Sequence, residues 1–568
     1  MTRHNGDVLV ETLLGYGVPV VFGLAGGQTL PLYDAIRSRP QQIRHLPMRD
    51  ERNAAYAADG YARISGRVGV CDATVGPGAI KFVSGLAEAL NSSSPLVALI
   101  SDMPSDWLAV RYRGGGNQLV DQVAILDPVC KWTARLPNDQ KVSELVQRAF
   151  QMATAGRPGP VAIELPEDLF RAAHDDPTPP VDPRFGSIPP FRSAPDPDAI
   201  RDAVRLLEEA ERPVVIAGGG IWFSQATEQL TALAEHLALP VATTLAGKGA
   251  IPETHPLSIG VLGALGGTAA ARKFVQDADV ILAVGFKFGQ NPTYRWTMPV
   301  PGQRIIHIDI DPAEIGKLFP VEVGIVADAR LALAAILAEC GSARSRTDIE
   351  TFIATHRAEW RARLEAEAAG AQPLKPQQVA MVIDELAGPD DILVCDASFA
   401  GGWGSLYFNV YGGRRAIFPR GMAGLGWGLP AAIGAQVARP GSNVIVLAGD
   451  GAMTFCLGEL ATLAQEGLNI TVVVLNNSTM GWIKWDQATF WDGKFQSTDL
   501  NRVNFARAAQ ALGCQGIEVS DPADLRGALS SAIGSTAPVL VDVQTTVKET
   551  PVAKFNESEQ AKGHMSRL

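Results

Sequence analysis

The stretch GDGAMTFCLGELATLAQEGLNITVVVLNN, residues 449–477, is the most informative part of this sequence. Its first residues close the apolar run SNVIVLAGD (442–450), which predicts a buried strand. A helix is expected at about 457–466, and a second apolar run, NITVVVLNN (469–477), ends in two asparagines. This order of strand, helix and strand predicts a parallel pair whose carboxyl ends share one edge of a sheet.

Oxygen donors stand at both strand ends. Asp450 offers a carboxylate, Asn477 an amide oxygen and Thr479 a main-chain carbonyl. Such hard donors bind Mg²⁺ and leave positions open for phosphate oxygens. The small residues Gly451 and Ala452 let main-chain N–H groups approach a phosphate at the following helix terminus. Gly-Asp-Gly alone is typical of a tight turn and Asn-Asn of a loop, but together on successive strand ends they favour a metal–diphosphate site.

Short β-rich runs alternate with helical stretches along nearly the whole chain, which predicts α/β domains with parallel sheets. The proline-rich segment 174–198 is expected to be an extended linker, and a charged helix is expected at about 347–371. We predict three such domains, at 1–173, 195–345 and 372–548, and a C-terminal tail or lid at 549–568. The other expected strands lie at 18–24, 67–75, 95–101, 159–165, 212–220, 240–245, 279–286, 304–312, 391–398 and 537–544.

The composition argues against several classes of protein. The 568 residues carry a formal net charge of −11, which disfavours nucleic acid or an anionic membrane surface as a partner. The six cysteines form no C-x-x-C pair, so neither a zinc site nor a disulfide framework is expected. No uncharged apolar run approaches ~18 residues, and the N-terminus lacks the apolar core of a signal peptide, so we expect no membrane span and a cytoplasmic location.

Beyond residues 449–477, further motifs in a fixed order point to one known family. The chain resembles the thiamine-diphosphate-dependent enzymes, and among them most closely acetolactate synthase and related 2-oxo acid carboligases and decarboxylases. The motifs that carry the resemblance are FGLAGGQTLPLYDAI (22–36), DERNAAYAADGYAR (50–63), VGPGAIKFVSGLAEAL (75–90), GRPGPVAIELPEDLF (156–170), HIDIDPAEIGK (307–317) and GMAGLGWGLPAAIGA (421–435).

The resemblance implies a pyrimidine-binding domain, a central domain and a diphosphate-binding domain. It implies thiamine diphosphate and Mg²⁺ as cofactors. It also implies active sites between the first domain of one subunit and the third of another, hence a homodimer or homotetramer. Expected substrates are a 2-oxo acid or a hydroxyketone.

The resemblance also assigns catalytic roles. Glu51 would hydrogen-bond N1′ of the pyrimidine and so favour the imino form of the cofactor. Leu425 would support the bend of the cofactor, and the Ala423 carbonyl would accept a bond from its 4′-amino group. Gln118 would reach the thiazolium and the reacting carbonyl. Without the resemblance, Glu51 would be a solvated helix-end carboxylate, Leu425 core packing and Gln118 an exposed loop residue.

Two further groups of residues complete the expected site. The cofactor contacts are Glu51, Gly76, Ala423, Leu425, Gly449, Asp450, Gly451, Ala452, Asn477, Thr479 and Gly481. The candidates for the substrate pocket are Gly27, Gln28, Lys81, Trp482, Lys484 and Trp485. The two tryptophans would wall a channel or pack a short helix.

The expected reaction is carbon–carbon bond formation or cleavage through an enamine on C2 of the cofactor. No histidine adjoins a motif that faces the pocket: Asp50 precedes Glu51, and Gly27 occupies the loop after the first strand. Proton donation by histidine, as in simple decarboxylases, is therefore not expected. The stretch NNSTMGWIKW (476–485) is similar to benzoylformate decarboxylase, which keeps aldehyde release as the alternative. A non-catalytic relative is disfavoured because Glu51 and the metal donors are present.

The central domain leaves a cofactor question open. The segment GVLGALGG (260–267) is near the pattern of acetolactate synthases that carry FAD, and the glycine run AGGGI (217–221) could face a nucleotide. However, GFKFGQNPTY (285–294) lacks the acidic pair and arginine associated with flavin contact. FAD, ADP and no nucleotide remain the alternatives.

Overall fold

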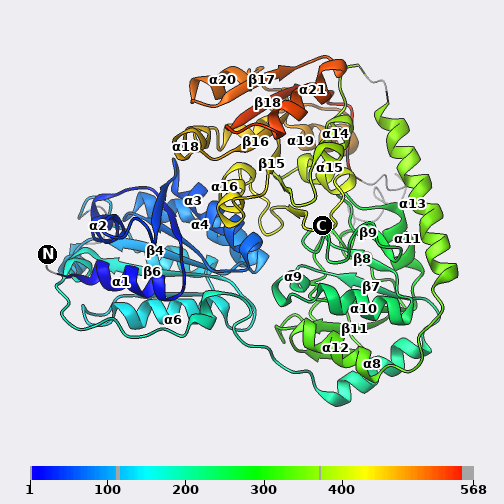
Figure 1. The fold of residues 1–568 in the computed structure, drawn as a ribbon, viewed down its shortest axis with the longest axis horizontal. Coiled ribbons are helices and arrows are strands. Elements are labelled where there is room, and N and C mark those ends of the chain that lie inside the picture. Colours follow the sequence, from blue (N-terminus) through cyan, green and yellow to red (C-terminus); the bar gives the residue numbers. More distant parts are fainter. Residues whose placement is uncertain (1–2, 111–114, 370–371, 553–568) are drawn as a thin grey trace.

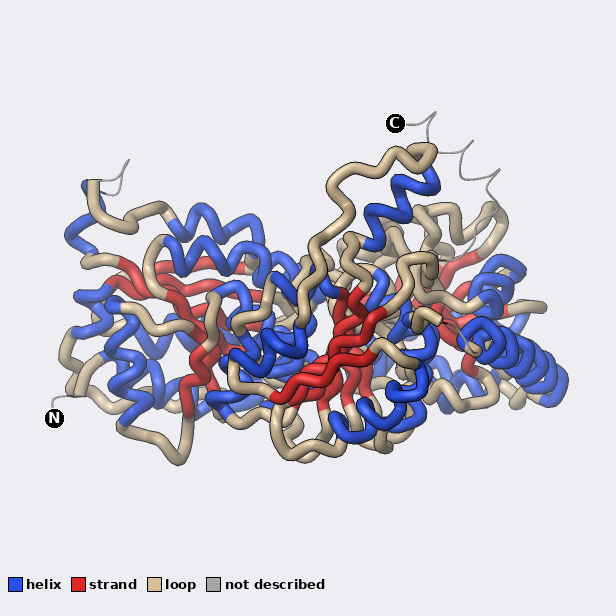
Figure 2. Tube along the Cα trace, turned by 90° about the horizontal axis from the view of Figure 1, so that it is seen from above, coloured by secondary structure: helices blue, strands red, loops and turns tan. Residues whose placement is uncertain are grey.

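The computed structural model describes residues 3–110, 115–369 and 372–552. The chain folds into three α/β units, each built on a six-stranded sheet in which all strand pairs are parallel (Figure 1). The first unit, blue to cyan, lies at the left of Figure 1, the second, green, at the lower right, and the third, yellow to red, at the top. Figure 2 shows helices around each group of strands. The predicted fold class is confirmed.

The first sheet has the strand order β2-β1-β3-β4-β6-β5. Its inner strands are apolar on both sides because helices cover both faces. The strands are β1 (Val20–Gly23), β2 (Arg44–Pro47), β3 (Gly69–Ala73), β4 (Leu96–Asp102), β5 (Trp132–Arg135) and β6 (Pro160–Pro166). The helices are α1 (Asn5–Gly15), α2 (Leu30–Arg37), α3 (Glu51–Ser65), α4 (Pro77–Ser92), α5 (Gln122–Leu126), α6 (Val142–Thr154) and α7 (Glu167–Arg171), with short 3₁₀ turns η1 (Gly27–Thr29), η2 (Ser105–Val110) and η3 (Asp127–Val129).

The second sheet has the order β12-β11-β10-β7-β8-β9 and its own apolar core. The strands are β7 (Pro213–Ala217), β8 (Val241–Thr243), β9 (Ser258–Val261), β10 (Val280–Val284), β11 (Arg304–Asp309) and β12 (Val323–Val326). The helices are α8 (Pro197–Glu209), α9 (Gly220–Ser224), α10 (Thr227–Leu237), α11 (Ala269–Asp277), α12 (Ala329–Glu339) and α13 (Thr347–Ala368). The charged helix α13 runs along the outside of this unit toward the third (Figure 1).

The third sheet, β14-β13-β15-β16-β18-β17, repeats the strand order of the first. Its central pair is in the register Gly449↔Leu475, so both strands end at one edge. The strands are β13 (Ile392–Cys395), β14 (Arg415–Ile417), β15 (Val444–Gly449), β16 (Ile470–Asn476), β17 (Gln515–Val519) and β18 (Val539–Gln544). The helices are α14 (Pro376–Leu386), α15 (Phe399–Tyr407), α16 (Gly428–Ala438), α17 (Asp450–Thr454), α18 (Glu459–Glu466), α19 (Gly481–Phe490), α20 (Phe505–Ala511) and α21 (Pro522–Ile533).

The first and third units share one hydrophobic core through α3 and α16. A Cβ atom on Gly60 would stand 2.1 Å from the Ala431 carbonyl oxygen, and one on Gly434 would stand 1.9 Å from the Ala57 carbonyl oxygen. Only glycine permits so close an approach of two backbones. The two units are therefore locked together at this crossing.

The structure adds six strands that the apolar pattern did not predict, and each is an edge strand of its sheet: β2, β5, β9, β12, β14 and β17. These strands are three to five residues long and several carry polar or half-exposed residues, so they lack the continuous apolar run of a buried strand. The helix after residue 449 also differs, because α17 begins at Asp450 itself and α18 follows.

The segments between the sheets follow the expectations only in part. Residues 174–198 contain one short 3₁₀ turn, η4 (Pro183–Gly186), and otherwise connect the first two units without regular structure before α8 begins. The described end of the chain, up to 552, contacts both later units: the Gly266 N–H donates to the Pro551 carbonyl at 3.2 Å, and Gln377 Nε2 donates to Glu549 Oε2 at 2.8 Å. Residues 553–568 of the proposed tail lie outside the described residues. The domain boundaries stay a prediction. No helix within the described ranges is both long and apolar enough to cross a membrane.

Candidate active site

The carboxyl ends of β15 and β16 bring Asp450, Asn477 and Thr479 together. The Asp450 carboxylate accepts three main-chain hydrogen bonds: Oδ1 accepts from Gly451 N at 2.7 Å, and Oδ2 from Asn477 N at 3.0 Å and Thr479 N at 3.3 Å. The Asp450 side chain thus connects the ends of β15 and β16, which the sequence pattern predicts to lie at one edge of the sheet.

This group of residues fits a hard cation. The Asp450 residue is 5% exposed, and burial raises the pKa of its carboxyl in spite of the main-chain donors around it. The neighbouring Asn477 Oδ1 is buried and accepts no hydrogen bond within the described structure. A buried carboxylate without a cationic partner and a buried oxygen without a donor are both unfavourable. A divalent cation would satisfy both, and these are the oxygen types that Mg²⁺ prefers.

The turn after β16 is held rigidly. Ser478 lies in the left-handed region with φ of +54°. Its carbonyl accepts from Leu500 N at 2.8 Å, and Met480 N donates to the Thr498 carbonyl at 2.8 Å. The Met480 sulfur lies against Gly451, where a Cβ would stand 2.8 Å from it. Around Gly449, in contrast, a Cβ would meet no atom within 4 Å, which leaves the space in front of Asp450 open.

The loop between β14 and α16 carries Ala423 and Leu425. Ala423 adopts a left-handed conformation with φ of +53°. Two buried carboxylates hold this loop, Glu88 on α4 and Asp396 after β13. Glu88 accepts from the N–H groups of residues 421–423 at 2.6–2.9 Å. Asp396 accepts from Gly426 N at 3.1 Å and Gly428 N at 2.7 Å.

The pKa values of these two carboxyls move in opposite directions. Burial by itself would raise the pKa of Glu88, but the charge of Arg63 and the main-chain donors together lower it. Burial raises the pKa of Asp396 to about 6, because its compensation comes mainly from backbone N–H groups. Neither residue was among the predicted site residues. The sequence does mark both residues as unusual, since Glu88 interrupts an apolar helix and Asp396 ends an apolar strand. Their hydrogen-bond partners, however, lie far away in the sequence.

The corresponding edge of the first sheet holds the predicted residues of the first unit. Glu51 begins α3 and is 5% exposed, and its Oε2 pairs with Lys81 Nζ at 3.1 Å. Its Oε1 lies at Gly78, where a Cβ would stand 3.0 Å from it. Asp50 caps the helix by accepting from Arg52 N at 2.9 Å. Glu51 is therefore a fixed carboxylate at a helix N-terminus rather than a solvated one.

Gly76 and Gln118 lie next to one another at this edge, and Gln28 is bound to Thr74, two residues before Gly76. Gly76 has φ of +65°, and a Cβ there would stand 2.1 Å from the Gln118 carbonyl oxygen, so this position requires glycine. Gln118 itself has φ of +63° and an exposed side chain. The Gln28 Oε1 accepts from Thr74 Oγ1 at 3.1 Å. Gly27 is exposed, and a Cβ on it would meet no atom within 4 Å.

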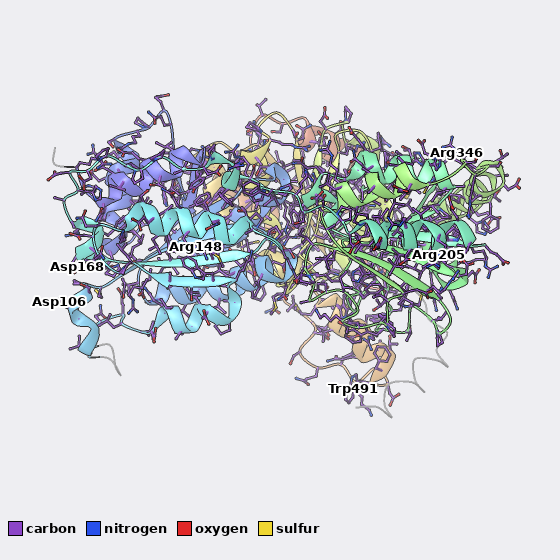
Figure 3. The ribbon with its side chains drawn as sticks, turned by 90° about the horizontal axis from the view of Figure 1, so that it is seen from below. Asp106, Arg148, Asp168, Arg205, Arg346 and Trp491 are labelled. Carbon is purple, nitrogen blue, oxygen red and sulfur yellow. The ribbon has the colours of Figure 1, made fainter. Side chains whose placement is uncertain are left out.

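The pocket candidates on α19 take different positions. The rings of Trp482 and Trp485 pack on Phe399, with centroid distances of 5.3 Å and 6.3 Å. Lys484 pairs with Asp499 on the following segment. Gly481 is the first residue of α19 and follows the Asn477–Met480 turn directly. Trp491, just beyond α19, is 66% exposed and projects from the body of the molecule (Figure 3).

The predicted residues thus form two groups within one chain. Glu51, Gln28, Gly76, Lys81 and Gln118 belong to the first sheet edge. The metal donors and the α19 tryptophans belong to the third. Between the residues that the structure describes, hydrogen bonds and ion pairs connect members of each group, and none joins the two groups.

A cavity of about 700 Å³ lies where the second unit meets the other two. The glycine run 218–220 and the side chains of Trp222, Lys287, Arg415 and Arg420 line it. The Arg415 guanidinium stacks over the Trp222 ring at 3.8 Å, and burial lowers the pKa of Arg415 to about 9 and that of Lys287 to about 8. Partly buried cations beside an aromatic ring suit an anionic ligand that carries a ring system.

Three family models match separate parts of the chain. The N-terminal TPP binding domain of thiamine pyrophosphate enzymes matches residues 3–125. The central domain of these enzymes matches residues 200–336, and their C-terminal TPP binding domain matches residues 396–543. Thiamine pyrophosphate is another name for thiamine diphosphate.

Similar proteins span nearly the whole chain. A probable acetolactate synthase large subunit from Methanocaldococcus jannaschii is 34% identical over 95% of this chain and 91% of its own length. The acetolactate synthase large subunit of Corynebacterium glutamicum is 34% identical over 95% of this chain and 86% of its own. The large subunit of acetolactate synthase isozyme 1 from Escherichia coli is 30% identical over 96% of this chain and 95% of its own.

Proposed function

This chain belongs to the thiamine-diphosphate-dependent enzymes, in their acetolactate-synthase-like part, and on that premise we propose that it forms or cleaves a carbon–carbon bond beside the carbonyl of a 2-oxo acid or hydroxyketone. The observation that carries the proposal for the site is the unsatisfied Asn477 Oδ1 beside the buried Asp450 carboxylate. It supports a bound Mg²⁺ at the edge where the third sheet would receive the cofactor's diphosphate.

Asp450, Asn477 Oδ1 and the Thr479 carbonyl would hold the Mg²⁺ in this proposal. The main-chain N–H group of Ala452 would bind the diphosphate, with the small residues Gly449, Gly451 and Gly481 leaving room for it. Thiamine diphosphate, when bound, supplies a thiazolium carbon that adds to carbonyl groups and accepts electrons from the bond that breaks.

The chain's own residues would prepare that carbon for reaction. Glu51 would hold a proton at N1′ of the pyrimidine, because a buried carboxylate at a fixed position stabilises the protonated ring nitrogen. The Ala423 carbonyl would orient the 4′-amino group, and the Leu425 side chain would press the two rings toward one another. Gln118 and Gln28 would line the side from which a substrate carbonyl approaches.

Carboligation is favoured over aldehyde release because, among the residues that the structure describes, the histidine of the first sheet closest to Glu51 in sequence is already bound. His45, the histidine nearest to Glu51 in sequence, is bound to Asp72, with Nε2 2.8 Å from Oδ1, and its ring packs on Tyr33. Gly27 leaves space beside Gln28 for a second substrate. Aldehyde release by a decarboxylase remains the competing function.

We further propose a homodimer or homotetramer that works in the cytoplasm. The two groups of site residues have no bonds to one another within the described chain, which supports a site completed by the first unit of another subunit. Lys81, which pairs with Glu51 and is half-exposed, would then lie at that junction.

A second binding function is favoured by the central cavity. Its partly buried cations and the Arg415–Trp222 stack support an anionic nucleotide such as FAD or ADP as a resident ligand. Absorbance of the purified protein at flavin wavelengths, and chromatography of the nucleotide released on denaturation, distinguish FAD, ADP and an empty cavity.

The cofactor site is tested by calorimetry of thiamine diphosphate in excess Mg²⁺. Wild type should bind and Asp450→Ala should not, because the variant loses the charged metal ligand and leaves three main-chain N–H groups without an acceptor. Equal affinity in both proteins would overturn the site assignment.

The reaction is tested by the products formed from pyruvate with and without an acceptor aldehyde or 2-oxo acid. The carboligase proposal expects the coupled product to dominate when acceptor is in excess. If free aldehyde dominates at every acceptor concentration, the decarboxylase alternative is correct.

A further inference from the structure

Residues 421–428 form a loop that we name the presenting loop, because it carries both Ala423 and Leu425. The loop has little regular structure of its own before α16 begins at Gly428. Ala423 is left-handed without being glycine, a conformation that is disfavoured unless the surroundings enforce it. The surroundings here are two carboxylates on different units of the fold.

Glu88 is the first of these, and it comes from α4 of the first unit. Its side chain is fully buried and accepts five hydrogen bonds. Oε1 accepts from Gly421 N at 2.8 Å, Ser92 Oγ at 2.9 Å and Arg63 Nη2 at 2.9 Å. Oε2 accepts from Met422 N at 2.6 Å and Ala423 N at 2.9 Å. Three successive N–H groups can meet one carboxylate only if the backbone curls around it, so Glu88 imposes the shape of the loop.

The charge of Glu88 is balanced by a network that also reaches the far end of the loop. Arg63 pairs with Asp59, and its Nη1 donates to the Phe418 carbonyl at 2.7 Å. Trp427 Nε1 donates to Asp59 Oδ2 at 2.9 Å. Together with Glu88, these residues anchor the chain just before the presenting loop, at its start and near its end.

Asp396 is the second carboxylate, and it comes from the third unit. It binds Gly426 N and Gly428 N and also its own neighbour, Ala397 N, at 2.7 Å. Leu425 lies between the segment that Glu88 holds and the segment that Asp396 holds. Its own position is therefore determined by residues that do not need to touch the cofactor.

We propose that Glu88 and Asp396 are positioning residues, which preorganise the presenting loop so that the Ala423 carbonyl and the Leu425 side chain meet the pyrimidine in a fixed geometry. This inference rests on the proposed function, in which the presenting loop contacts the cofactor. In this inference the two buried acids contribute to the activation of the cofactor and not only to the stability of the fold.

The test compares Glu88→Gln, Glu88→Asp and Asp396→Asn with wild type, all with saturating thiamine diphosphate and Mg²⁺. The measurement is the rate of hydrogen–deuterium exchange at C2 per bound cofactor, followed by NMR after acid quench, together with kcat and KM. An amide in place of Glu88 turns one acceptor into a donor that faces N–H groups, which displaces the loop. Displacement of a reacting group by about 1 Å costs on the order of 10²-fold in rate. We expect a loss of that order in exchange and kcat with KM little changed, and partial rescue by Glu88→Asp.

The matched control is Glu164→Gln. Glu164 is also a buried acid of the first unit and pairs with Arg135, but on β6 and β5, away from the presenting loop. Loss of its charge should lower the melting temperature without changing C2 exchange. If the Glu88 variants or Asp396→Asn lower only the melting temperature and exchange normally per bound cofactor, the inference is wrong.

The outcomes also separate this inference from the proposed function. If wild type itself neither binds thiamine diphosphate nor exchanges its C2 proton, the proposed function fails. If wild type exchanges and the variants exchange equally fast, only the positioning role fails. Should Glu88→Gln not fold, Asp396→Asn decides the question, because it perturbs the same loop from the other unit.

Discussion

Asn477→Ala should have opposite effects on the apoenzyme and on the cofactor complex. The substitution removes the buried Oδ1, which has no donor in the described structure. A buried acceptor left without a partner costs about 1–3 kcal/mol, so its removal offsets the packing lost with the side chain. We therefore expect the free energy of unfolding of the apoenzyme to change by less than about 1 kcal/mol, in contrast to a typical core truncation.

The complex should lose affinity, because the same oxygen is proposed as a ligand of Mg²⁺. Loss of a residue that only supports a metal ligand lowers affinity by about 10–100-fold, which is about 1.4–2.8 kcal/mol, so loss of a direct ligand should cost at least that much. Calorimetric titration with thiamine diphosphate in excess Mg²⁺, alongside urea unfolding of the apoenzyme, measures both quantities on one sample.

The neighbouring residue provides the control. Asn476 likewise has a buried Oδ1 without a donor in the described structure, but its Nδ2 donates to the Val503 carbonyl and to Asp542 Oδ1, both at 2.9 Å. These two bonds stabilise the fold on the other side of β16. Asn476→Ala should lower the stability of the apoenzyme and largely keep the cofactor affinity of the folded protein. If Asn477→Ala binds cofactor as tightly as wild type, or if both variants behave alike, the metal-site reasoning is refuted.

Three further predictions concern catalysis, pH and packing. Glu51→Gln should keep cofactor binding but slow C2 exchange by about 10²–10⁴-fold, since an amide cannot stabilise the protonated N1′, and an unchanged exchange rate would remove Glu51 from the mechanism. Burial raises the pKa of Asp396 from 3.8 to about 6, so this group contributes stability that is present below about pH 4 and is lost as the pH rises through 6. Urea unfolding across this range should show a smaller loss of stability with rising pH in Asp396→Asn than in wild type, and equal slopes in the two proteins would contradict the prediction. Gly434→Val should destabilise the protein by more than about 3 kcal/mol or prevent folding, because its Cβ would overlap the Ala57 carbonyl, and a melting temperature near that of wild type would contradict the close crossing.

The fold could be predicted where the chain has a continuous apolar run. The inner strands, such as β15 and β16, are buried on both faces, so hydrophobicity alone locates them. The edge strands could not be found in this way. In β17, for example, Gln515 and Glu518 are exposed and only Val519 is buried, so its pairing with β18 depends on the tertiary structure.

The site was predictable where one motif carries it and not where distant segments cooperate. Asp450 and Asn477 lie on consecutive strands, and their spacing was sufficient. Glu88 was part of a recognised motif, but its partners at 421–423 are more than 300 residues away along the chain. Nothing in the local pattern around Glu88 indicates which donors will surround it. The Arg415–Trp222 stack likewise joins two units and has no local signature.

The crossing of α3 with α16 also affects how the protein is made. These helices share one core, yet roughly 360 residues separate the end of α3 from the start of α16. At a synthesis rate of about 5–20 residues per second, roughly 20–70 s pass between the synthesis of α3 and that of α16. During that time the first unit exposes apolar surface that its own sequence cannot cover. Nascent chains stalled before residue 428 should therefore bind a general chaperone, and release should follow once α16 has left the ribosome.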